Sequence, residues 1–214
     1  MEILIGLTIL ILSAILHEIA HGFVADRLGD PTARLMGRLT LNPKSHIDPM
    51  MSIALPLLLI LSGSPVIFGA AKPVPVDPFN LKEGRKDMAL VALSGPLTNI
   101  VLAVLASFLI KLISLPVVIN VLSPLLFSIL FFIFYIILRY NLLLAILNLL
   151  PIPPLDGSKV FSLLLPDKEA NAYLSLGSIG IFILFFLLLF PFGGFSLGSF
   201  LFSLLSFAEG LLLP

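Results

Sequence analysis

The sequence predicts an all-α polytopic membrane protein with about five or six transmembrane or re-entrant segments. Hydrophobic residues make up 59% of its 214 residues and charged residues only 11%, whereas a soluble domain is nearer half apolar and a quarter charged. The mean hydropathy is +1.17. The charges are also spaced so that long charge-free runs remain, and about 20 apolar residues suffice to cross a bilayer as a helix. Basic and acidic residues, twelve of each, cancel, so no basic surface indicates a nucleic-acid partner.

The charge-free runs are joined by short polar stretches. The first run is expected to be retained, because the chain begins Met1-Glu2 and lacks the basic start of a cleaved signal peptide. The second contains Pro56 and a Ser-Gly-Ser-Pro sequence at 62–65, which favours a bent or re-entrant element over a straight helix. The fourth is long enough for one tilted helix and a shorter broken piece. The runs are expected at about 3–24, 49–71, 88–110, 117–150, 172–190 and 195–212. The His17 to His21 cluster interrupts the first run, and Arg139 and Glu209 are the charges of the fourth and the last.

Lys and Arg indicate which loops are cytoplasmic. The polar stretches 26–48 and 72–87 each contain four basic residues. Because basic residues concentrate in short cytoplasmic loops, both stretches are expected on the cytoplasmic side. The run between them would then enter and leave on one side, and the N-terminus would face outside.

A His-Glu-x-x-His sequence interrupts the first apolar run, as His17-Glu18-Ile19-Ala20-His21. On a helix, residues four apart share one face, so both imidazoles can reach a single Zn²⁺. Glu18 lies beside them, where it can take a proton from water that the metal acidifies. The chain has no cysteine, so any metal must be held by His, Asp or Glu.

The depth of this cluster separates a metal site from its plain alternative, a polar helix end that emerges into water. From Ile3 to His17 the helix rises through 14 residues, which is roughly 21 Å. The cluster would therefore lie within the hydrocarbon, towards the cytoplasmic side, where ionisable groups are costly unless they have a function.

A catalytic zinc ion usually takes three protein ligands, and the third is not adjacent in this sequence. His46 and Asp48 have the spacing of another class of zinc protease, but they lie in a polar loop where neither needs a special explanation. Asp156 interrupts an apolar stretch between Pro154 and Gly157, and an acid there is costly unless it is paired or bound to metal. The residues themselves favour Asp156 and leave the other two open.

Four motifs follow one another over about residues 10 to 165: His17–Gly22, Phe68–Val76, Ser94–Asn99 and Asn148–Gly157. With them the chain resembles the site-2 protease family of intramembrane zinc metalloproteases, in its compact prokaryotic branch. The resemblance implies that Asp156 is the third ligand, that one Zn²⁺ is bound per chain, and that Asn99 and Asn148 are polar groups of the active-site region. It also implies cleavage of transmembrane protein substrates near the cytoplasmic side of the prokaryotic plasma membrane.

The whole chain, 1–214, is expected to form a single integral-membrane peptidase domain with a zinc site inside its helix bundle. Its core would cover about 1–165, and about 172–214 would add C-terminal helices. The alternation of Pro and Val from Lys72 through Pro73, Val74 and Pro75 excludes helix, so this stretch is either a plain loop or an extended edge that pairs with an unwound substrate.

The remaining polar residues have structural alternatives beside their functional ones. Asn148 could cap a helix, and Asn99 could bond two helices together. His46 is either a loop residue or a gate. Two rival functions are a membrane metal-ion transporter that uses the same His, Glu and Asp cluster, and an inactive relative that binds membrane partners.

Overall fold

The computed structural model describes residues 2–46, 54, 61, 72–191, 193–194 and 196–213. Within these residues every regular element is a helix, and no strand occurs. The fold class expected from composition is therefore confirmed. The second apolar run, with its predicted re-entrant path, lies almost entirely outside the described residues, as does Asp48.

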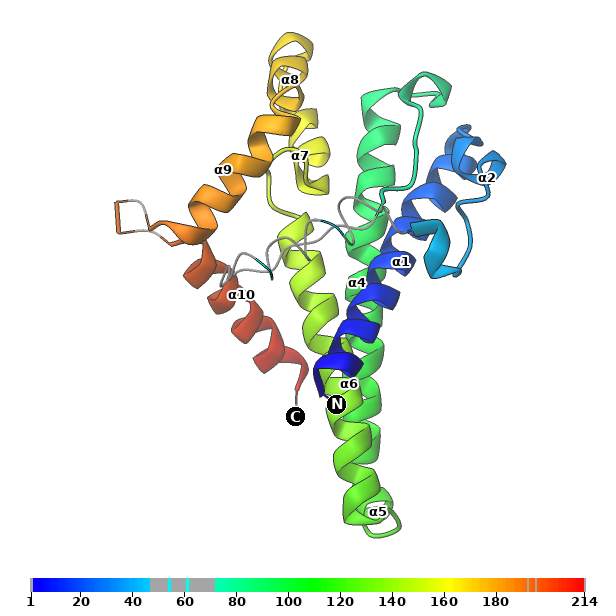
Figure 1. Cartoon of the computed structure of the whole chain (residues 1–214), viewed down its shortest axis with the longest axis vertical. Coiled ribbons are helices and arrows are strands. Elements are labelled where there is room, and N and C mark those ends of the chain that lie inside the picture. The colour runs from blue at the N-terminus through cyan, green and yellow to red at the C-terminus, as the bar shows by residue number, and fades with distance from the viewer. Residues whose placement is uncertain are drawn as a thin grey trace.

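Three long helices form the centre of the molecule: α1 (Glu2–Leu28), α4 (Arg85–Ile113) and α6 (Pro124–Asn148). Helices α4 and α6 run side by side, and the short α5 (Pro116–Ile119) joins them at one end, while α1 crosses them obliquely (Figure 1). The apolar run 117–150 therefore contains one long helix and a short broken piece, as expected. By length and composition these three helices can cross a membrane.

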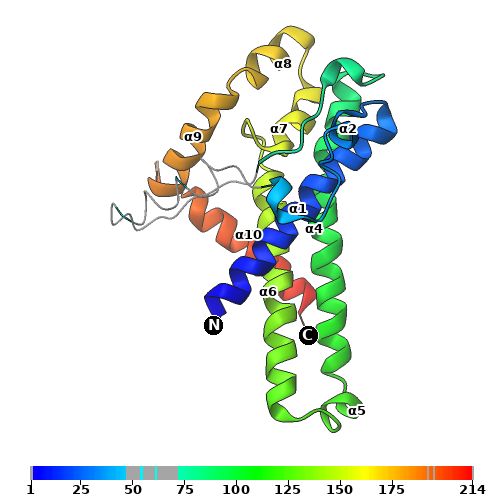
Figure 2. The same ribbon diagram turned by 45° about the vertical axis from the view of Figure 1, so that its right-hand side comes forward.

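The C-terminal part bends back along α6. Helices α8 (Asp167–Leu174) and α9 (Gly177–Leu189) meet at 68°, and if this pair is one broken span the protein has up to four candidate spans within the described residues. Helix α10 (Leu197–Leu212) is shorter and returns towards the middle of α6 (Figure 2). The remaining short helices of the described residues are α2 (Thr32–Leu35), η1 (Pro43–His46), η3 (Pro78–Asn80), α7 (Asp156–Phe161) and η4 (Ser162–Leu164).

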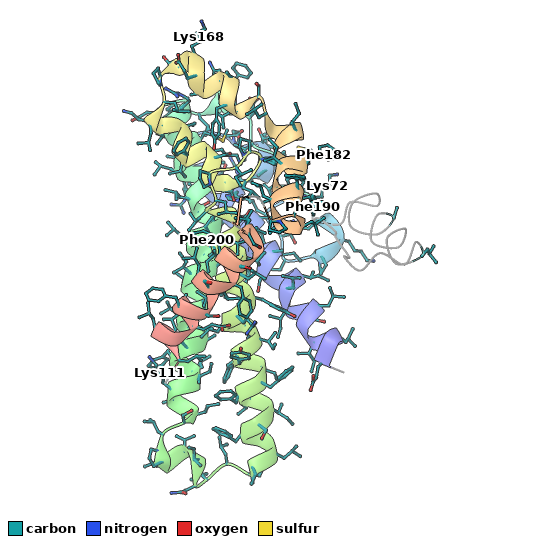
Figure 3. All side chains as sticks on the ribbon, turned by 90° about the vertical axis from the view of Figure 1, so that its left-hand side faces the viewer. Lys72, Lys111, Lys168, Phe182, Phe190 and Phe200 are labelled. Atoms are coloured by element: carbon teal, nitrogen blue, oxygen red, sulfur yellow. The ribbon has the colours of Figure 1, made fainter. Side chains whose placement is uncertain are left out.

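Small side chains let the long helices pack closely. Ala103 and Ala106 of α4 are buried against Leu138 and Leu142 of α6, and Leu205 of α10 completes this core. Outside it, many large apolar side chains remain exposed, such as Phe182, which is 72% exposed. Figure 3 shows Phe182, Phe190 and Phe200 at levels between Lys168 and Lys111. An apolar surface between charged ends is what a lipid bilayer requires of a spanning protein.

Candidate metal centre

Helix α1 supplies two histidines one turn apart. His17 and His21 are only 6% and 7% exposed, and their ring centroids lie 4.6 Å apart. Their Nε2 atoms are 3.0 Å apart. The i, i+4 spacing on one helix face therefore brings both Nε2 atoms to one point, as the sequence predicts.

Asp156 joins them from a position 139 residues after His17. It begins α7 after the Pro-rich stretch that ends α6, and it is 6% exposed. Its Oδ2 lies 3.2 Å from the Nε2 of His17 and 3.1 Å from that of His21. Among the described residues, these three form the group of His, Asp and Glu side chains that could hold a metal ion, with ligand atoms all within 4.8 Å of one another.

The hydrogen bonds behind the imidazoles explain why these atoms suit a cation. His21 Nδ1 lies 2.7 Å from the carbonyl oxygen of Val91, and His17 Nδ1 lies 2.6 Å from Oδ1 of Asn99. Both partners are acceptors, so each Nδ1 carries the hydrogen and each Nε2 of a neutral ring has a free lone pair. Two lone pairs and a carboxylate oxygen would repel one another at 3.0–3.2 Å unless a cation lay between them.

The distances also match zinc. Ligands about 2.0–2.1 Å from a tetrahedral zinc ion lie about 3.3 Å from one another, close to the 3.0–3.2 Å found here. Imidazole and carboxylate are both ordinary zinc ligands. The donor set therefore fits a zinc ion with three protein ligands and an open fourth position.

Gly95 makes room for the two imidazoles against α4. A Cβ at this position would lie 2.6 Å from Cε1 of His17 and from Cε1 of His21, which is closer than real Cβ contacts. Any larger residue would push α4 away from the histidines. The Ser-Gly-Pro motif thus has a packing reason that the sequence alone does not reveal.

Lys159 contacts the metal centre from the Asp156 side. Its Nζ donates to the other carboxylate oxygen of Asp156, Oδ1, at 3.0 Å, while Oδ2 faces the histidines. The lysine therefore fixes which oxygen is presented to the histidines, and it leaves Asp156 one oxygen, Oδ2, with which to contact a metal ion.

Glu18 is held by the extended segment 72–77, here called the strap. The carboxylate oxygen Oε2 of Glu18 accepts a hydrogen bond of 2.7 Å from the backbone N–H of Val74. Val74 is buried, and it packs so close to α1 that a Cβ on Gly22 would lie 2.8 Å from its Cγ1. The strap therefore lies against the face of α1 that carries Glu18 and Gly22.

Charged side chains anchor the two ends of the strap. Arg38, only 6% exposed, donates from Nη2 to the carbonyl oxygens of Lys72 and Pro73 at 2.9 and 3.2 Å. At the other end, Oδ2 of Asp30 accepts a 2.7 Å bond from the N–H of Asp77. The backbone N–H of Lys72 is bound by the carbonyl oxygen of His46 at 2.8 Å.

Asp30 is a buried carboxylate that is saturated with donors. It is 0% exposed, and besides Asp77 it accepts from the backbone and hydroxyl of Thr32 and from the side-chain amide of Asn80. Burial by itself raises the pKa of the Asp30 carboxyl, but these hydrogen bonds outweigh it and hold that pKa below its ordinary value. The ionised form therefore ties the end of α1 to the strap.

The other sequence-predicted residues divide into two groups. Asn99 lies at the centre, against His17. Asn148 donates to the carbonyl oxygen of Leu144 in its own helix at 2.9 Å, and His46 donates from Nε2 to that of Thr40 at 2.8 Å. Neither of these two has a described contact with the three ligand side chains, so their active-site roles stay predictions.

Sequence reasoning missed several residues that the structure brings to the site. Arg38 and Asp30 lie in a polar stretch in which charges are ordinary, so nothing distinguished them. Asn141 and Ser13 have a usable signal, because each is a polar residue inside a long apolar run. Both are buried, at 0% and 4% exposure. Asn141 contacts Asn99, and Ser13 contacts Asn141.

The fold and this centre agree with the comparison to known proteins. Residues 5–125 and 109–191 match peptidase family M50, so most of the chain is covered. The chain belongs to peptidase family M50. The resemblance predicted from the four motifs is thereby confirmed.

Two curated relatives carry names that state a zinc chemistry. A protein of Bacillus subtilis named "Putative zinc metalloprotease YwhC" is 36% identical over 88% of this chain and 81% of its own length. A Mycobacterium tuberculosis protein named "Putative zinc metalloprotease Rip2" is 34% identical over 83% of this chain. The chain spans only 62% of that second relative. No solved structure matches the chain.

Proposed function

We propose that this protein is an intramembrane zinc metalloprotease that hydrolyses peptide bonds of transmembrane protein substrates near the cytoplasmic side of a prokaryotic plasma membrane. It would cross that membrane several times and bind one zinc ion per chain. The observation that carries the proposal is the convergence of His17, His21 and Asp156 within 4.8 Å, with Glu18 between the two histidines in sequence. Membership of peptidase family M50 and the names of the relatives support the reaction class.

In this proposal His17, His21 and Asp156 hold the metal. A bound zinc ion would polarise the scissile carbonyl and acidify the attacking water. The three side chains supply one negative charge in a buried setting, so the centre keeps a net positive charge for the developing oxyanion. Lys159, bound to the outer oxygen of Asp156, keeps that carboxylate in place.

Glu18 is the proposed general base. It takes a proton from the attacking water and passes it to the leaving amine, which is the usual division of work in His-Glu-x-x-His proteases. The Val74 N–H bond holds one carboxylate oxygen and leaves the other free for the proton transfer. The base is thereby oriented by the strap rather than by a neighbouring side chain.

The strap is the proposed docking edge for the substrate. A peptide bond inside a helix is hidden until the helix unwinds, and an extended edge can bind the unwound chain through main-chain hydrogen bonds. Among the described residues, neither the N–H nor the C=O of Val76 has a hydrogen-bond partner. Both groups of one residue point to the same edge of an extended chain, so Val76 offers a donor and an acceptor together.

The test is a comparison of purified wild type with Glu18→Gln and Asp156→Ala, measuring zinc content and cleavage of a transmembrane substrate. We expect Glu18→Gln to keep zinc and to lose cleavage by about 10²–10⁴-fold, the usual contribution of a general base. Asp156→Ala should lose both. Glu83→Gln, a change at an exposed carboxylate, is the control and should alter neither.

The same variants, assayed for metal flux, distinguish the rival function. A metal-ion transporter would need its ligands but has no special use for Glu18 in turnover, so Glu18→Gln would leave metal flux near that of wild type. Full cleavage activity in Glu18→Gln would refute the assignment of the base. Normal zinc binding in Asp156→Ala would refute the assignment of the third ligand.

A further inference from the structure

A closed circuit of buried polar side chains lies behind His17. From α1 it passes to Asn99 of α4, then to Asn141 of α6, and returns to α1 at Ser13, one turn before His17. Asn99 Nδ2 donates to Asn141 Oδ1 at 2.8 Å, and Asn141 Nδ2 donates to Ser13 Oγ at 2.9 Å. Asn99 and Asn141 are both 0% exposed and Ser13 is 4% exposed. We call Ser13, Asn141 and Asn99 the relay.

The direction of every bond in the relay is fixed by one backbone group. Asn141 Nδ2 also donates to the carbonyl oxygen of Ile137 at 2.8 Å, and a carbonyl can only accept. The amide of Asn141 must therefore turn its nitrogen to Ile137 and its oxygen to Asn99. Since that oxygen needs a donor, Asn99 must turn its own nitrogen to Asn141.

The same logic carries the polarity on to the metal centre. With its nitrogen engaged, Asn99 turns Oδ1 to His17, 2.6 Å from Nδ1. An acceptor at that position requires Nδ1 of His17 to carry the hydrogen, which leaves Nε2 with its lone pair. That lone pair faces Asp156 and His21. The carbonyl of Ile137 thus determines, through two amides, which nitrogen of His17 can bind a metal.

His21 reaches the same tautomer without a relay. Its Nδ1 donates directly to the carbonyl oxygen of Val91, a group that no side-chain substitution removes. The two histidines therefore have equivalent polarity, but that of His17 depends on three replaceable side chains. A purely structural role for the relay would require hydrogen bonds between helices, but it would not require this particular direction.

We infer that Asn141 and Ser13 are positioning residues of the zinc centre, which act through Asn99 by fixing the tautomer and ring orientation of His17. The inference rests on the proposed metal site and names three side chains that maintain it. Outer groups that orient a metal-binding histidine typically change metal affinity by about 10–100-fold when they are removed. Neutral amides serve here because a charged partner at this depth would be costly.

The test is a double-mutant cycle read out as zinc affinity, by competition with a chelator, on the purified full chain. Asn141→Leu frees the Asn99 amide to turn round, and we expect zinc affinity to fall about 10–100-fold. Asn99→Asp removes the donor to Asn141 but keeps an acceptor oxygen at Nδ1 of His17, so the tautomer of His17 no longer depends on Asn141. In the Asn99→Asp background, Asn141→Leu should therefore change affinity less than about threefold.

The outcomes separate the inference from the proposed function. If wild type binds no zinc, the proposed function fails. If wild type binds zinc and Asn141→Leu costs nothing, or costs the same in both backgrounds, the relay is only structural and the inference is wrong.

A second measurement needs no substitution in the relay. The chain has three histidines, so ¹⁵N-histidine labelling of the zinc-bound protein gives three resolvable pairs of ring nitrogens, and His46→Gln identifies one pair. We expect His17 and His21 to carry the hydrogen on Nδ1, and His46, which donates from Nε2 to Thr40, to carry it on Nε2. An Nε2–H tautomer at His17 would overturn the inference, even if Asn141→Leu fails to fold.

Discussion

The relay and the anchors of the strap hold the site from two sides with different chemistry. The relay is neutral throughout: a hydroxyl and two amides, enclosed by the three long helices. The strap is anchored by Arg38 and Asp30, in the polar stretch that follows α1, and it contacts Glu18 one residue from His17. Charges are costly in hydrocarbon but acceptable near water, so the anchors of the strap can be charged while the relay is neutral.

From this difference we expect the two regions to affect two different quantities, zinc affinity and the rate of cleavage. The relay ends on the imidazole of His17, a proposed metal ligand, so its loss should appear first in zinc affinity. The strap binds Glu18 through the N–H of Val74, so the loss of this bond should appear first in the rate of cleavage. Substitutions that separate these two quantities therefore test the comparison directly.

The largest effect is expected at Val74, because the strap contacts Glu18 through a backbone N–H. Val74→Pro removes that donor, and the extended segment between Pro73 and Pro75 already has the backbone that proline prefers. We expect cleavage to fall about 100-fold, the lower end of the contribution of a general base, with zinc content unchanged. Val74→Ala keeps the N–H and should retain most activity. Equal losses in the two variants would mean that packing, and not the hydrogen bond, is what matters.

The second largest effect is expected for the zinc affinity of Asn99→Leu. Asn99→Leu removes the acceptor of the His17 Nδ1–H, and affinity should fall about 10–100-fold. Ser94→Ala is the matched comparison on the His21 side: Ser94 Oγ donates to the carbonyl of Val91 and lies 3.3 Å from Nδ1 of His21, but His21 bonds that carbonyl directly. Competition with a chelator should detect less than about a threefold change in Ser94→Ala. A large loss there would contradict the independence of the two histidines.

A pH-dependent effect on stability is expected only on the charged side. The pKa of Asp30 is lowered in the folded state, so its stabilisation is complete above the unfolded value of about 3.9 and is lost as pH falls through the folded pKa. Asp30→Asn should lower stability by about 1–3 kcal/mol at pH 7. Thermal unfolding of the two proteins at pH 7, 5, 4 and 3 should show this gap closing below about pH 4. A gap that is constant with pH would exclude an ionised Asp30.

The smallest effect is expected at Ser13. Ser13→Ala removes one of the two acceptors of Asn141, but the carbonyl of Ile137 still fixes the direction of that amide. We expect a loss of about 0.6–1.7 kcal/mol in stability, as for other hydrogen bonds between membrane helices, and a fall in zinc affinity that is smaller than the fall of about 10–100-fold expected for Asn141→Leu. A greater loss of zinc affinity than in Asn141→Leu would reverse the order of the relay.

The contacts of the candidate centre that could be predicted from the sequence are those with a local signal. His17 and His21 lie four residues apart on one helix, so their convergence follows from helix geometry. An acid in an apolar stretch needs a reason, which favours Asp156, and the structure brings it within 3.2 Å of both histidines. Asn148 and His46 have motif or spacing signals of the same kind, but their described side-chain bonds lie within their own segments.

The sequence by itself determined the class of the protein, its long helices, and the chemical identity of the candidate metal ligands. These depend on composition, on charge-free runs and on a period of 3.6 residues, all of which are local properties of the chain. Only the tertiary structure decided the partners of those residues: Asn141 with Asn99, Val74 with Glu18, and Arg38 with the strap. Such pairs join distant segments; Asn141 and Ser13, for example, are 128 residues apart. The direction of the hydrogen bonds in the relay depends on how three helices pack, which no local pattern encodes.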